Sequence, residues 1–161
     1  MILIGCICNN ASVIGDYNGA LAVVTDISYF AREQGEANAA GIIEESVKIQ
    51  EPFLSILAEC EVTLVLLLML IQPSPQRIRP EHSKTLEKYA WECNDENMAA
   101  AFLSEDMFLL LQSLVMACQS RDTEDLKELE KDLWVEINTE QRHLLHLVLI
   151  KMVHPESQTV G

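Results

Sequence analysis

The sequence predicts an all-α protein, folded as a compact antiparallel bundle of about six or seven helices. Apolar residues recur at intervals of three and four along most of the chain, while the alternating β-branched pattern of strands is almost absent. The 161 residues include 49% hydrophobic residues and only 6 Gly and 5 Pro, which is enough apolar material for a core. Short breaks between the expected helices favour antiparallel packing of neighbours.

The N-terminal part begins with an irregular lead-in over residues 1–15, whose apolar, Gly-punctuated sequence fits a strand, an extended segment or a frayed helix. The first firm helix is expected over residues 16–34. Asp16 and Asn18 are candidate N-caps because short polar side chains satisfy free backbone N–H groups at helix starts. Gly35 is the expected C-terminal stop.

Two further helices are expected before the middle of the chain. One covers residues 36–50 and ends before Pro52, because a proline disfavours the helical conformation of the residue that precedes it. The next covers residues 52–71, and its last ten residues, 62–71, are apolar on every side. A helix of that kind must be covered on every side, so we expect it at the centre of the core.

The apolar run over residues 62–71 also raises the question of a membrane. Ten residues are too few to cross a bilayer, which takes about 20, and Glu59 and Glu61 lie on one side with Pro73 and Pro75 on the other. The sequence therefore predicts no membrane partner.

A proline-containing linker is expected over residues 72–80, because three prolines at this spacing exclude a helix. It joins two helical groups, 1–71 and 81–153, of a single domain that spans residues 1–161. The tail over residues 156–161 is expected to be frayed.

Four helices are expected after the linker, over residues 81–93, 94–119, 122–137 and 139–153. The long second one has a possible restart at Ser104, and Thr139 is the expected cap of the last one. The first should bury the stripe Leu86, Tyr89, Ala90 and Cys93. The second should bury a broad face made of Met107, Leu110, Leu111, Leu114, Val115 and Cys118.

The five cysteines form no CxxC pair and are too scattered for a disulfide framework. Cys60, Cys93 and Cys118 each lie in an apolar stretch and are expected as small buried hydrophobic residues. The first residues are not expected to act as a secretion signal, because no basic residue precedes the short apolar run. These features predict a cytoplasmic protein.

The charge is strongly acidic, with a formal net value of -14. Residues 81–140 carry 15 acidic and 5 basic side chains. Such a field disfavours nucleic acid and anionic membranes as partners and favours a protein, with a basic protein as one candidate. The acidic faces are either simply solvated or form a docking surface. The candidate interaction residues are Glu124, Asp125, Glu128 and Asp132.

Trp91 and Trp134 are the largest candidate anchors. Both lie beside an apolar stripe, so each fits half-buried core or an interface, and core packing is the favoured interpretation.

A histidine stripe on the last helix is the strongest candidate for metal chemistry. His143, His146 and His154 lie on one polar edge, which favours exposure to solvent. Glu140 and His143 have the spacing used in di-iron carboxylate bundles, but a second Glu-x-x-His is missing. A single metal bound by His143 and His146 would need a third ligand. Carboxylates that could converge on such a site are Glu44, Glu45, Glu59 and Glu61.

The chain carries no nucleophile elbow, no His-Glu-x-x-His motif and no phosphate-binding glycine loop. We therefore expect a non-enzymatic helical protein-interaction module without a cofactor, and its apolar content favours self-association into a homo-oligomer. One alternative is a metal- or ligand-binding bundle enzyme that uses the histidines with carboxylates. Another is an acidic inhibitor that mimics nucleic acid and occupies a basic protein.

Overall fold

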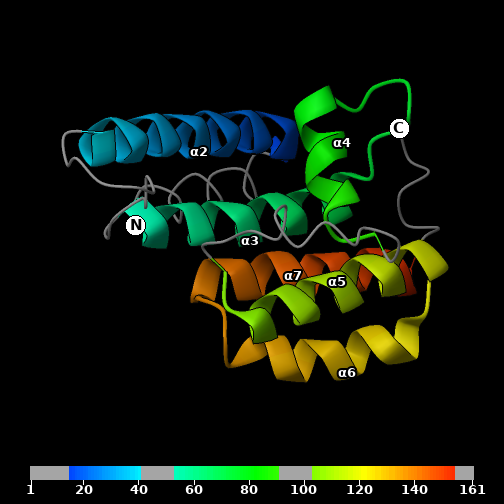
Figure 1. Cartoon of the computed structure of the whole chain (residues 1–161). Helices are drawn as coiled ribbons and strands as arrows, with labels where there is room; N and C mark the ends of the chain where they lie inside the picture. The colour runs from blue at the N-terminus through cyan, green and yellow to red at the C-terminus, as the bar shows by residue number, and fades with distance from the viewer. Residues whose placement is uncertain (1–14, 41–52, 91–102, 155–161) are drawn as a thin grey trace. The chain divides into compact units, whose positions relative to one another are not determined.

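The computed structural model describes residues 15–40, 53–90 and 103–154. Within these ranges the chain forms six helices and no strand, which confirms the all-α fold class. The lead-in over residues 1–14, the tail and residues 41–52 and 91–102 lie outside the described part. Figure 1 shows the helices, which are α2 (Tyr17–Ala40), α3 (Phe53–Ile71), α4 (Pro80–Glu87), α5 (Glu105–Ser120), α6 (Thr123–Trp134) and α7 (Thr139–Val153).

The chain divides into two compact units, Met1–Leu64 and Val65–Gly161, with the boundary inside α3. The non-helical segment Gln72–Arg79 follows α3 and therefore belongs to the second unit. A single domain over the whole chain stays a prediction.

Helix α2 begins where the sequence suggested and continues past its expected end. The Gly19 N–H donates to Asp16 Oδ1 at 2.9 Å, so Asp16 caps the helix. Leu21, Val24 and Ala31 are buried on one face of the helix. The predicted stop at Gly35 is wrong, because its backbone is helical and the helix runs on to Ala40. A glycine inside a helix costs only about 1 kcal/mol relative to alanine, which a long helix tolerates.

Helix α3 is the apolar helix that the sequence placed in the core. Every residue from Cys60 to Leu70 is buried, including Glu61 and Thr63. Among the described residues it is also the one helix long and apolar enough to cross a membrane by length and composition. However, 67% of that apolar stretch is buried in the structure, which is also expected of a core helix.

Helix α4 is shorter than predicted and buries a different face. It ends at Glu87, Ala90 is exposed, and the buried positions on the helix are His82 and Thr85. Tyr89 is fully buried just beyond its end, where its ring stacks on that of Phe108 with centroids 5.1 Å apart. The apolar stripe predicted for residues 81–93 is therefore wrong over its described part, except at Tyr89.

Helices α5 and α6 are joined by a tight turn. Ser104 caps α5 by accepting from the Met107 N–H at 3.2 Å, so the possible restart at Ser104 is the observed beginning. Arg121 adopts a left-handed backbone with φ 56, which ends α5, and Asp122 then caps α6 through the Asp125 N–H. This turn brings α6 back along α5.

Helix α7 packs against α6 and buries an arc of apolar residues, Leu144, Leu145, Val148, Leu149 and Met152. Its cap is Asn138 rather than the predicted Thr139. The Asn138 side chain accepts from the Gln141 N–H at 2.9 Å, while the Gln141 side chain accepts from the Asn138 N–H at 3.1 Å. This reciprocal capping box satisfies two backbone donors at once.

The end of α3 is fastened to α7 inside the second unit. Lys151 Nζ donates to the Leu70 carbonyl, and Gln72 Nε2 donates to Met152 Sδ at 3.5 Å. Burial lowers the pKa of Lys151, since a low-dielectric surrounding disfavours the charged ammonium.

Candidate protein-binding surface

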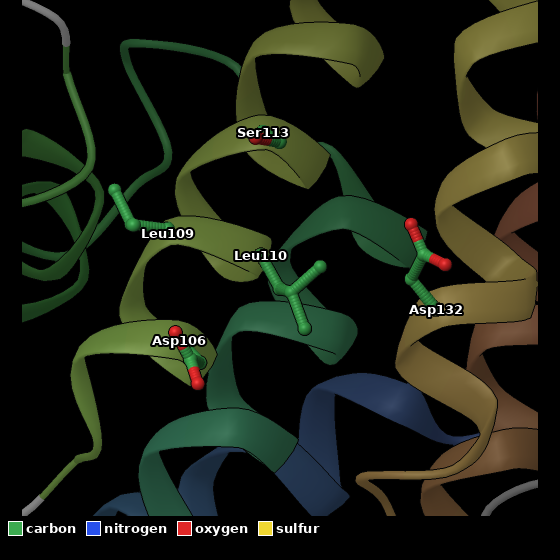
Figure 2. A pocket seen from close by; sticks show the side chains of 5 residues that line it. All are labelled: Asp106, Leu109, Leu110, Ser113 and Asp132. Carbon is green, nitrogen blue, oxygen red and sulfur yellow. The ribbon is translucent and has the colours of Figure 1, made fainter.

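A shallow depression of about 320 Å³ lies on the surface between α5 and α6. Its lining residues define what we name the α5–α6 depression: Asp106, Leu109, Leu110, Ser113 and Asp132. Figure 2 shows Leu110 between the two carboxylates, with Asp106 on α5 and Asp132 on α6. The depression therefore combines an apolar floor with negative charge on both helices.

The exposure of its residues makes the depression accessible to a partner. Leu109 is 50% exposed, and both Asp106 and Asp132 are exposed. Leu110 was expected to be fully buried but is only partly so, since it lines the depression. The prediction of a broad buried face on α5 is thus wrong at Leu110 and Met107 and confirmed at Leu111, Leu114, Val115 and Cys118.

The four predicted acidic interaction residues are all exposed on α6. Glu124 pairs with Lys127 at 2.9 Å, and Asp125 lies in the first turn, where the helix dipole favours a negative charge. Of these four residues, Asp132 lines the α5–α6 depression and the other three do not. Sequence reasoning identified Asp132 but missed Asp106, Leu109, Leu110 and Ser113, because their juxtaposition depends on how α6 turns back along α5.

Trp134 lies at the C-terminal end of α6 and is 43% exposed, so the favoured interpretation as a core residue is wrong. The Arg142 guanidinium lies 5.3 Å from the centroid of its ring, and Arg142 Nε donates to the Trp134 carbonyl at 2.6 Å. Next to it, Val135 is 75% exposed. The other candidate anchor, Trp91, lies outside the described residues.

The histidine stripe of α7 faces solvent at His143, His146 and His154. His146 Nδ1 lies 3.6 Å from Glu130 Oε1 on α6, which forms an ion pair when the imidazole is protonated. Among the residues that the structure describes, no three His, Cys, Asp or Glu side chains form a group that could hold a metal ion. Glu140 lies in the first turn of the same helix.

The carboxylates named with these histidines do not complete a described site. Glu59 and Glu61 belong to the Met1–Leu64 unit, whereas His143 and His146 belong to the other unit. Glu44 and Glu45 lie outside the described residues.

Three buried ionisable side chains have perturbed acid–base properties. Burial raises the pKa of both Cys60 and Cys118 to about 12, and both thiols are free, as predicted for small buried residues. Cys93 lies outside the described residues. Burial also lowers the pKa of His82, with a smaller lowering by Arg79 that Glu81 opposes.

This chain is similar to two proteins that are named for their association with huntingtin. The chain is 37% identical to the 40-kDa huntingtin-associated protein of Rattus norvegicus over an alignment of 186 positions, gaps included, which covers 90% of this chain. It is 46% identical to the protein of the same name from Mus musculus over 125 residues, or 76% of this chain. No family model matches the chain.

These relatives are considerably longer than the aligned segment. The chain spans about half the length of the rat relative, with 49% covered, and 33% of the mouse relative.

Proposed function

We propose that this chain is a helical protein-binding module whose partner is huntingtin. The observation that carries the proposal is its identity of 37% and 46% to two proteins named for their association with huntingtin. The chain spans about half of the rat relative. The proposal therefore requires that this shared segment alone contains residues that bind huntingtin.

The described surface supports a binding role. Apolar side chains are exposed on several helices, including Leu109 on α5, Trp134 on α6 and Phe30 on α2. Aromatic residues are the usual anchors of protein interfaces, and carboxylates nearby would steer a basic partner toward them. The net charge of -14 makes the association sensitive to salt.

Co-elution tests the proposal directly. The purified chain is mixed with purified huntingtin and separated by size exclusion, with the rat 40-kDa relative run in parallel to show that the huntingtin preparation can bind. We expect the chain to shift into the huntingtin peak. If the rat relative shifts and this chain does not, the proposal is wrong.

The cellular location is a second, weaker part of the proposal. The free buried thiols of Cys60 and Cys118 favour a reducing compartment, and we place the protein in the cytoplasm on that ground. Fluorescence imaging of the tagged chain tests this, and exclusive staining of the secretory pathway would contradict it.

A further inference from the structure

The α5–α6 depression has the chemistry of a binding site for one kind of protein segment. Its floor contains a leucine that is 50% exposed and a second that is partly exposed. At about 320 Å³ it lies at the lower end of the range for ligand pockets, and it is shallow. Such a depression fits an apolar side chain of a partner better than an enclosed small molecule.

The charge of the residues that line the depression indicates which kind of partner segment would bind there. Asp106 and Asp132 line the depression from different helices, and no lysine or arginine lines it. Neither carboxylate has a hydrogen bond or an ion pair to another described residue, whereas Glu124 already pairs with Lys127. The nearest basic side chain along α6, Lys131, is exposed and does not line the depression. The two aspartates are therefore available to cations on both sides of the apolar floor.

We infer that the α5–α6 depression binds a basic amphipathic helix of the partner protein. An apolar side chain of that helix covers Leu109 and Leu110, and Lys or Arg side chains three or four positions away pair with Asp106 and Asp132. The pairing is complementary in charge because the charged side chains that line the depression, Asp106 and Asp132, are both negative. For huntingtin as the partner, the inference rests on the proposed function, but the depression can also be tested with a peptide alone.

Two variants test the site and a third is their control. All three change exposed side chains, so the fold should persist. Asp106→Asn with Asp132→Asn removes both charges and keeps the shape. Leu109→Ser removes the apolar contact and keeps the charges. The matched control, Asp26→Asn with Glu136→Gln, removes two exposed negative charges outside the depression. Circular dichroism and thermal unfolding check that each variant is folded.

The probe is a synthetic helical peptide with one leucine and with lysines three and four positions away from it on either side. The control peptide carries glutamates in place of the lysines. Binding is measured by fluorescence anisotropy at low and at moderate salt. We expect the lysine peptide to bind the wild-type chain and the matched control equally. The double aspartate variant and Leu109→Ser should each bind roughly tenfold more weakly.

The same variants are then measured against huntingtin, which separates the two claims. If the wild-type chain binds huntingtin but the depression variants bind as tightly as the control does, the inference about the depression is wrong and the proposed function stands. If huntingtin is not bound but the peptide shows the expected differences, the proposed function fails and the depression site holds. Equal binding of the lysine peptide by all variants overturns the inference. Binding that appears only together with dimerisation, seen by sedimentation, identifies a second copy of the chain as the occupant and also overturns it.

Discussion

His82 is a buried side chain on α4 whose charge the surrounding structure disfavours. Its folded pKa lies below the ordinary value of 6.5, so the unfolded chain binds the proton more readily than the folded one. The stabilising contribution of the neutral imidazole is thus present above about pH 6.5 and is lost as the pH falls through the folded pKa.

Replacement of His82 tests this linkage. We expect the free energy of unfolding of His82→Gln to depend less steeply on pH between 7 and 5 than that of the wild type, because the variant has no proton to take up at this position. Urea unfolding followed by circular dichroism measures the slope. His143→Gln, at an exposed position, is the control for replacing a histidine by glutamine. An unchanged slope for His82→Gln would contradict the assignment.

Cys60 and Cys118 should be poorly reactive in the folded protein. With the pKa raised from 9.0 to about 12, the thiolate fraction at pH 8 falls, and burial blocks access as well. We expect alkylation by iodoacetamide at pH 8 to be roughly a hundredfold slower in buffer than in urea at both sites, read by peptide mass spectrometry. Rapid native labelling of either residue would show that it is not buried.

The raised pKa of the two thiols predicts that the folded protein loses stability at alkaline pH. A thiol with a raised pKa keeps its proton in the folded state when the unfolded chain has already lost it, so stability falls as the pH rises above about 9. Cys118→Ala should weaken this decline, and a denaturation series between pH 8 and 10.5 measures it.

The residues of the candidate site were only partly predictable. Asp132 could be chosen because the charge pattern of α6 puts it on the polar face. Asp106 and Leu109 could not be predicted as site residues, because they line a depression only when Asp132 lies across from them. That arrangement follows from the left-handed turn at Arg121. Core packing was favoured for Trp134 because it lies beside the apolar stripe of its helix. Its contact with Arg142, eight positions further along the chain, has no signature in the local sequence.

At the scale of elements, the start of α7 gives the clearest prediction. Asn138 and Gln141 form a reciprocal capping box, so Asn138→Ala should lower the free energy of unfolding by about 1 kcal/mol. Thr139→Ala is the matched control and should change it by less than about 0.5 kcal/mol. Chemical denaturation of both variants decides between the caps, and a larger loss for Thr139→Ala would restore the position expected from sequence.

The periodicity of apolar residues predicted the existence of the helices well and their ends less well. Buried stripes on α3 and α7 were strong enough to identify both helices with nearly correct bounds. The helix end predicted at Gly35 was wrong because a glycine weakens a helix without stopping it. The early end of α4 could not be predicted, because no proline or glycine follows that helix. Asn138 and Thr139 are adjacent and both are good N-cap residues, so the sequence alone does not decide which of them caps α7.

At the scale of the whole molecule, exposed apolar surface on α2 favours self-association. Val23 and Phe30 lie on one face of the helix and are 42% and 62% exposed, with Tyr29 nearby at 65%. We expect concentration-dependent dimerisation in sedimentation equilibrium that weakens about tenfold or more in Phe30→Ser. Val135→Ser, at another exposed apolar position, serves as the control. A strict monomer at high concentration would contradict this expectation.

The central claim is that this acidic, all-α chain binds huntingtin through the segment that it shares with the 40-kDa huntingtin-associated proteins. The most direct measurement is a competition experiment, in which increasing amounts of the purified chain are added to immobilised huntingtin already carrying the labelled rat relative. We expect the chain to bind huntingtin and to displace the labelled relative in a salt-dependent manner. A chain that is folded by circular dichroism yet neither binds nor displaces the relative, at concentrations well above those at which the relative saturates huntingtin, would contradict it.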